Sequence, residues 1–222
     1  MSGTPLVATP VYGLRTWTVC GEPGHERLAG PQRGAPWPVG GAWLDASCPG
    51  DEAHAAPAPG CDCGIHAWHP RPGAARRILA SRREVPGVVE AVGAIEVHAD
   101  GFRAERARPY VLIVAPGRNA GLAHRLADAY DVPIVEAGGP DDVLRWCGER
   151  GLGLAEPVVA ELLGADELDA QRKARRAAGR ADVVRLAAAI VLAALLVVAG
   201  LIVTDDPGDR PLQGRAGEVN SR

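Results

Sequence analysis

The chain has 222 residues, with 24 Lys and Arg against 27 Asp and Glu and a formal net charge of −3. This balance creates no overall positive field, so we expect no nucleic-acid partner. All but one of the 24 cations are arginine, and together with the abundant alanine this bias indicates a GC-rich genome rather than selection for phosphate binding.

Residues 1–70 are rich in glycine, proline and tryptophan. This content of Gly and Pro excludes long helices, so we expect a small β part with strands at Leu14–Val19, around Trp43 and at Ile65–Trp68, and a loop at 49–59. Four of the five tryptophans lie in this part. Two interpretations stay open: the indole rings fill the core, or they form an aromatic surface for a ligand.

Residues 71–151 have the pattern of an α/β part, which we expect to share one core with residues 1–70. Pro72 can open a helix that runs to about Arg83. Asp100-Gly101 then predicts a hairpin between strands at Val88–His98 and Phe102–Ala107. We interpret Arg103, in the returning strand, as a solvated residue at a strand end, with anion binding as the alternative.

A parallel strand–helix–strand unit is predicted after residue 110. Tyr110–Ala115 is a short apolar run typical of a buried strand, and Asn119 can cap the helix that follows. Val132–Glu136 is the next expected strand, and Pro140 can open a further helix that ends at Gly151. Together with residues 1–70, these elements predict the α+β class.

Residues 152–185 are predicted to form a helical linker or stalk. Pro157 can start a short helix that Gly164 ends, and residues 165–181 are almost all good helix formers. A basic cluster follows the acidic residues of this segment, an order that suits helix polarity.

Residues 186–204 form an uncharged apolar run of the length that a membrane helix needs. At about 1.5 Å per residue the run covers roughly 28 Å, close to the thickness of the bilayer core. Its apolar residues surround the whole helix, which a half-buried soluble helix would not need. We therefore predict a single transmembrane helix, followed by a disordered tail at 205–222.

Charge predicts the orientation of this membrane helix. The flank before it is basic and the tail after it is rich in Asp, so the preceding domain should face the cytoplasm and the short tail the outside. The N-terminus has no basic segment followed by an apolar core, and so no sign of a signal peptide. In the cytoplasm the five cysteines should be reduced.

Cysteine and histidine are concentrated between positions 48 and 69. The metal-ligand candidates are Cys48, Cys61, Cys63 and His66, because zinc takes four ligands from thiolates and imidazoles. The C-x-C spacing is not a standard zinc pattern and needs a sharp turn, which Gly64 could permit. The alternatives are a redox role for the thiols, and small buried thiols without chemistry. Cys20 and Cys147 are isolated and are interpreted as core residues.

Three sequence elements carry a resemblance to a known group of proteins: YGLRTW near the start, CDCGIHA after an earlier cysteine, and GAIEVHADGFRAERA. The combination resembles uncharacterised proteins from high-GC Gram-positive bacteria, which share Cys-x-Cys-Gly-Ile-(His or Tyr)-Ala and Gly-(Phe or Tyr)-Arg-Ala-Glu. The similarity covers roughly residues 11–148. It implies no activity; because Tyr can stand at the position of His66, it implies that Cys48, Cys61 and Cys63 are the stronger ligand candidates.

The sequence thus predicts a membrane-anchored cytoplasmic α+β domain without a recognised catalytic motif. We expect a binding or adaptor module that meets a protein or small-molecule ligand at the bilayer. The alternative is a zinc- or thiol-dependent enzyme or redox sensor built on Cys48, Cys61 and Cys63. A third option is a scaffold that acts through the small residues of its membrane helix.

Overall fold

The computed structural model describes residues 6–30, 35–48, 50, 54–117, 119–174 and 177–178. The chain divides into two compact units, Met1–Gln171 and Arg172–Arg222, and the strands β1–β7 and helices α1–α4 described below all belong to the first. The apolar run at 186–204 and the tail at 205–222 lie outside the described residues. Within the described part, no helix has both the length and the apolar character needed to cross a bilayer.

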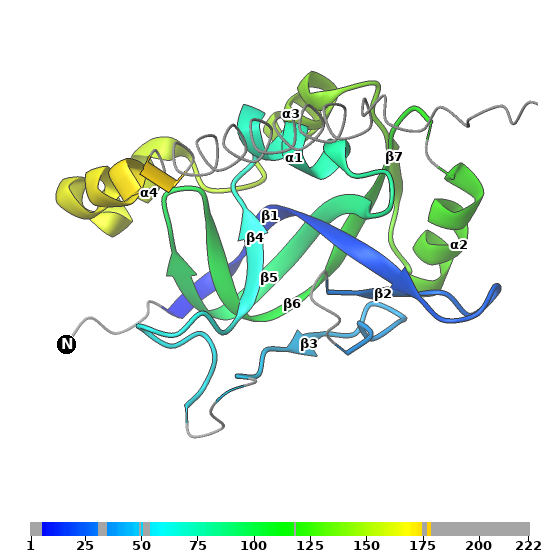
Figure 1. The fold of residues 1–222 in the computed structure, drawn as a ribbon, viewed down its shortest axis with the longest axis horizontal. Helices are drawn as coiled ribbons and strands as arrows, with labels where there is room; N and C mark the ends of the chain where they lie inside the picture. Colours follow the sequence, from blue (N-terminus) through cyan, green and yellow to red (C-terminus); the bar gives the residue numbers. More distant parts are fainter. Residues whose placement is uncertain are drawn as a thin grey trace, which may run out of the picture. The chain divides into compact units, whose positions relative to one another are not determined.

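Four antiparallel strands close into a small β barrel: β1 (Leu6–Cys20), β4 (Ile65–Trp68), β5 (Val85–Val97) and β6 (Gly101–Val114). β5 pairs with both β1 and β6, and β4 bridges β6 back to β1 (Figure 1). β2 (Arg27–Ala29) pairs with β1, whereas β3 (Leu44–Asp45) and β7 (Ile134–Glu136) pair with β6. The two predicted parts therefore share one sheet, and the described fold is α+β.

The β5–β6 hairpin turns where Asp100-Gly101 predicts it. β6 is one continuous strand, however, so the prediction of separate strands at Phe102–Ala107 and Tyr110–Ala115 is wrong. Pro109 pairs with Val89 beside a register shift, an irregularity at which a strand tolerates proline. A Cβ atom at Gly101 would lie 2.1 Å from the Ala67 carbonyl oxygen, so glycine allows β4 to approach the hairpin closely.

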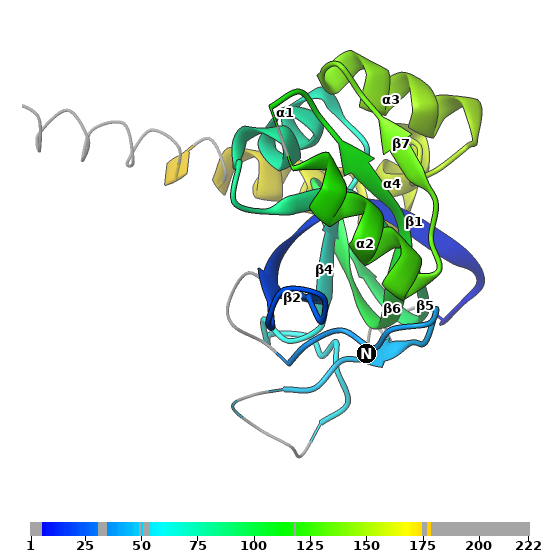
Figure 2. The ribbon, with the colours of Figure 1, turned by 90° about the vertical axis from the view of Figure 1, so that its right-hand side faces the viewer.

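The helices cover two sides of the barrel (Figure 2). α1 (Pro72–Ala80) and α3 (Pro140–Glu149) pack against each other; α1 ends before the predicted Arg83, because Ser81 is already extended. α2 (Ala120–Tyr130) connects β6 to the parallel β7, which confirms the predicted strand–helix–strand unit.

The start of the predicted linker packs against the barrel. α4 (Glu156–Leu163) ends at Gly164 as predicted, and residues 165–174 are helical. Val159 belongs to the main apolar core, and Leu168 is also buried. The first unit accordingly extends to Gln171.

The main core fills the barrel and continues under α2. Trp17 and Trp37 are fully buried in it with their rings edge to face at 5.4 Å, so these two indoles are core residues. Tyr130 of α2 accepts a hydrogen bond from the Leu28 amide at 2.9 Å and donates one to the Trp37 carbonyl at 3.0 Å. A second apolar cluster lies between the outer face of the barrel and the α1–α3 pair.

Candidate metal centre

The connection between β3 and β4, residues 46–64, is here called the cysteine loop. Its described part contains no helix or strand, and it lies on the side of the barrel away from α1 and α3 (Figures 1 and 2). Loops longer than about 12–15 residues without secondary structure are uncommon and usually functional. The apolar cluster of this loop consists of small residues only, centred on Cys48, Ala56 and Cys63. Because this apolar cluster is small, we expect interactions other than hydrophobic burial to hold the loop in place.

Four potential metal ligands converge within the cysteine loop: Cys48, His54, Cys61 and Cys63. One ligand atom from each lies within 4.8 Å of all the others. The Sγ atoms of Cys48 and Cys61 are 3.7 Å apart, and Sγ of Cys63 is 3.4 Å from Nε2 of His54. All three cysteines are free thiols, since a disulfide would need about 2.05 Å between sulfur atoms.

The two closest contacts of this cluster given above can be compared with the geometry of zinc. Zinc binds sulfur at about 2.3 Å and nitrogen at about 2.0–2.1 Å. At tetrahedral angles these bond lengths separate two sulfur ligands by about 3.8 Å, and a sulfur from a nitrogen by about 3.6 Å. The observed 3.7 Å and 3.4 Å are close to both values, so the cluster could hold a metal ion such as zinc.

The structure brings three of the four predicted ligand candidates together, and the histidine that lies beside them is His54 rather than His66. Side chains alternate along a strand, and in β4 the flanking Ile65 and Ala67 point inward while His66 is exposed. Nε2 of His66 lies 3.0 Å from the Asp62 carbonyl oxygen instead. The position of His54 between Cys48 and Cys61 was the available signal, but residues 49–59 were predicted only as a loop.

Gly64 provides the turn that the C-x-C spacing needs. Its φ of +115° lies in a region that residues with a side chain rarely adopt. A Cβ atom there would also lie 3.1 Å from Cβ of Arg103. Glycine thus lets the chain reverse directly after Cys63 and enter β4, with both thiols on the side of Cys48 and His54.

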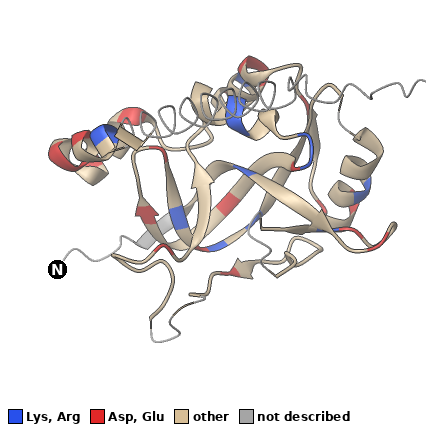
Figure 3. Cartoon of the chain, in the orientation of Figure 1, with Lys and Arg blue, Asp and Glu red and all other residues tan. Residues whose placement is uncertain are grey.

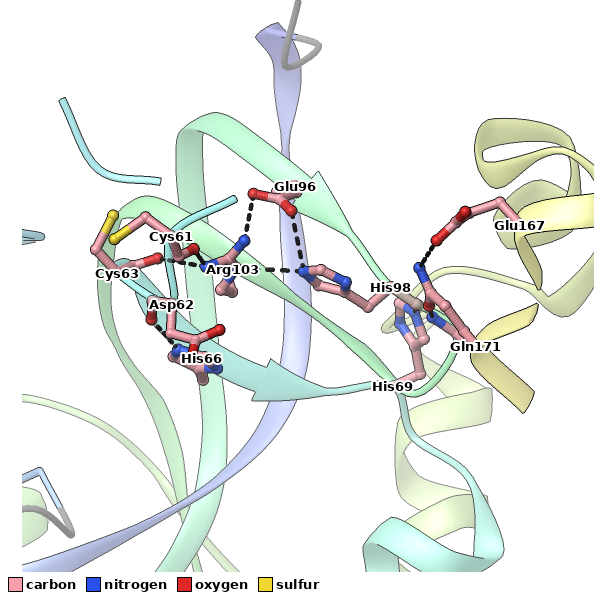
Figure 4. Close-up of polar contacts among 11 residues, drawn as sticks. Cys61, Asp62, Cys63, His66, His69, Glu96, His98, Arg103, Glu167 and Gln171 are labelled. Carbon is pink, nitrogen blue, oxygen red and sulfur yellow. Dashed lines mark hydrogen bonds and ion pairs between the residues drawn. The ribbon is translucent and has the colours of Figure 1, made fainter. Parts of the chain in front are cut away.

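Arg103 of β6 holds the backbone of the two C-x-C cysteines (Figure 4). Its NH1 group donates to the carbonyl oxygens of Cys61 and Cys63, the latter at 3.2 Å. Its NH2 group pairs with Oε2 of Glu96 at 2.6 Å. The residue is only 5 % exposed, so both interpretations of Arg103 from the sequence, solvated strand end and anion binder, are wrong. It instead fixes the cysteine loop to the barrel.

Two histidines lie near Arg103: His98 contacts the arginine directly, and His69 contacts the backbone of His98 at the hairpin turn. Nε of Arg103 donates to Nε2 of His98 at 3.2 Å, and Nε2 of the fully buried His69 donates to the His98 carbonyl at 3.0 Å. Burial lowers the pKa of His69, and burial also lowers the pKa of His98, against the opposing charge of Glu96. Both rings are therefore neutral near pH 7, and neither lies in the ligand cluster.

The other side of the hairpin turn contacts the helix at 165–174 (Figure 4). Oε1 of Gln171 accepts a hydrogen bond from the Ala99 amide at 2.8 Å, and the Gln171 amide donates to Glu167 at 2.9 Å. Arg71 donates to the Ala99 carbonyl at 2.7 Å. The turn thus joins the region of the cysteine loop to the C-terminal end of the first unit.

The two remaining cysteines lie outside the cluster. Cys147 is buried in α3, and burial raises the pKa of its thiol to about 11, which confirms its interpretation as a core residue. Cys20, at the end of β1, is only partly buried.

Charged residues of both signs are spread over the strands and helices of the described part (Figure 3).

Comparison with protein families, with curated proteins and with solved structures finds no match for this chain.

Proposed function

We propose that this protein is a zinc-binding interaction module, tethered to a membrane, in which zinc organises the cysteine loop. The observation that carries the proposal is the convergence of three cysteines and one histidine within 4.8 Å. Three thiolates and one imidazole are a common ligand set of structural zinc sites. The zinc would be a structural cofactor rather than a reactive centre.

The number of ligands favours a structural role over catalysis. A catalytic zinc keeps one coordination position open for water or substrate, whereas a structural zinc has four protein ligands. Cys48, His54, Cys61 and Cys63 would together supply all four ligands of such a site. Arg103 supports the site from outside, by donating to the carbonyl groups of two ligands rather than to a substrate position.

The membrane tether rests on the apolar run at 186–204, and the orientation on the basic flank before it. A cytoplasmic location also agrees with the zinc site, because thiols stay reduced in that compartment. The domain would then present the cysteine loop to a protein or small-molecule partner at the membrane. Deleting 186–204 should move the protein from the membrane fraction to the soluble fraction; retention in the membrane would contradict the tether.

Metal analysis of the full chain, purified in a mild detergent, tests the zinc site. We expect about one zinc ion per chain. His54→Ala should lose the metal, or bind it at least roughly 10- to 100-fold more weakly, the effect that even outer-shell changes produce. His66→Ala is the matched control and should keep it. A wild-type chain without metal, or equal losses in the two variants, would contradict the proposal.

A further inference from the structure

We propose that Cys48 and Cys61 form a peroxide-sensitive pair, whose oxidation to a disulfide releases the metal. The inference rests on the proposed zinc site and adds a regulatory chemistry to it. It comes from differences among the three thiols in exposure, in spacing and in how the backbone holds them.

Cys61 is the most exposed residue of the three. Cys48 and Cys63 are 9 % and 6 % exposed, whereas Cys61 is of intermediate exposure. Oxidation of cysteine follows access to the sulfur and its thiolate character. Metal coordination supplies the thiolate form at all three positions, so access distinguishes them, and we assign the first attack to Cys61.

Cys48 is the partner that we assign to an oxidised Cys61. Their sulfur atoms are 3.7 Å apart, so they must approach by about 1.7 Å to reach the disulfide length. Sγ of Cys63 is instead 3.4 Å from the His54 ring. Arg103 also holds the carbonyl groups of both Cys61 and Cys63, which keeps these two residues in their present backbone geometry. Among the described contacts of Arg103 none is to Cys48, so we assign the approach of the two sulfur atoms to Cys48.

The chemistry proceeds in two balanced steps. The Cys61 thiolate attacks hydrogen peroxide, the O–O bond breaks, and Cys61 becomes a sulfenic acid while hydroxide leaves. The Cys48 thiolate then attacks the Cys61 sulfur, which forms the S–S bond and expels a second hydroxide. Two protons convert the hydroxides to water. The two thiolates lose two electrons in total, and hydrogen peroxide gains them.

The disulfide removes two of the four ligands. His54 and Cys63 remain, too few to complete a structural zinc site. The cysteine loop would lose its main source of order, while the Arg103 contacts keep its C-terminal end attached to the barrel. A thiol reductant returns both cysteines to thiols, and the site can then bind zinc again.

The test uses the full chain with Cys20→Ser and Cys147→Ser, which leaves only the three cluster thiols. Metal content is measured first. Hydrogen peroxide is then added with a colorimetric zinc chelator, and the free thiols are alkylated before peptide mass spectrometry. We expect about one zinc ion released per Cys48–Cys61 disulfide, an alkylated Cys63, and recovery of zinc binding after reduction.

Different outcomes separate the oxidation site from the zinc site. A chain that holds no zinc before peroxide is added would overturn the zinc site and its release together. A chain that holds zinc and keeps it under peroxide would overturn the oxidation site alone. Zinc release with a Cys61–Cys63 disulfide, or with Cys48 recovered as an alkylated thiol, would also overturn the oxidation site and leave the zinc site standing. Cys48→His, which keeps a zinc ligand but no second thiol, should bind zinc and form no disulfide to position 48.

Discussion

The barrel and the cysteine loop lie in one compact unit but depend on different interactions. The barrel has a continuous apolar core and strands paired around its circumference. The cysteine loop has a small cluster of alanine and cysteine side chains, four converging ligand atoms, and the contacts of Arg103. The difference teaches that the barrel has a hydrophobic core of its own, whereas the order of the loop depends on small side chains, the contacts of Arg103 and, in our proposal, a bound metal.

Trp17→Ala should have the largest effect on the barrel side of this comparison. Trp17 is fully buried against Trp37, and truncation of such a side chain costs about 3–5 kcal/mol of the free energy of unfolding. Trp43→Ala is the matched control, because Trp43 is only partly buried, with Arg108 over its ring. Denaturant unfolding measures both variants. Equal losses would contradict the assignment of Trp17 to the core and Trp43 to the surface.

Arg103→Met should affect both regions. The substitution leaves the Cys61 and Cys63 carbonyls and the Glu96 carboxylate without their cation, which we expect to cost about 2 kcal/mol in unfolding free energy. Because the ligand backbone loses its support, zinc affinity should also fall by roughly 10- to 100-fold. Competition with a zinc chelator measures the affinity. Unchanged affinity in a destabilised Arg103→Met variant would show that the arginine serves the barrel alone.

Local signals in the sequence predicted much of the barrel but little of its closure. Asp100-Gly101, Asn119 and Pro157 act over a few residues, and each marks a turn or helix start where the structure has one. The β1–β4 pairing joins Leu14 to Trp68, a contact far apart in sequence that no local pattern reveals. The sequence predicted two strands in place of β6, because the returning strand of the hairpin and the apolar run at Tyr110–Ala115 have separate local patterns.

The metal centre was predictable in its residue types but not in its full membership. Three cysteines close in sequence indicated the cluster, and His66 was the predicted histidine, while His54 lay in a segment predicted only as a loop. Strand alternation in β4 turns the His66 side chain outward. The role of Arg103 depends on a hairpin meeting a distant loop, so its sequence neighbours could not reveal it.

His69 should make the stability of the barrel sensitive to acid. Burial lowers the pKa of His69 in the folded state, while the unfolded chain has the ordinary value of about 6.5. The unfolded state therefore binds more protons between these two pKa values. The contribution of neutral His69 to the free energy of unfolding is full above about pH 6.5 and decreases as the pH falls below it.

His69→Gln should reduce the slope of unfolding free energy against pH in this acid range, whatever it does to stability at pH 7. The exposed His25 provides the control, since His25→Gln should leave the slope unchanged. Urea unfolding at a series of pH values gives both slopes. An acid slope as steep in the His69 variant as in the wild type would contradict the assignment.

Asn119→Ala should have the smallest effect, and only on the barrel side. The Asn119 side chain accepts a hydrogen bond from the Leu122 amide at 3.0 Å and caps α2, and loss of such a cap costs about 1 kcal/mol. Asn119→Asp keeps an acceptor oxygen and should retain most of the stability. α2 buries Leu126 and Tyr130 in the main core, so the loss should appear in urea unfolding of the whole domain. Zinc affinity should stay unchanged, because no described contact joins α2 to the cysteine loop; a parallel loss of zinc would mean that the two regions are coupled more closely than their separate interactions suggest.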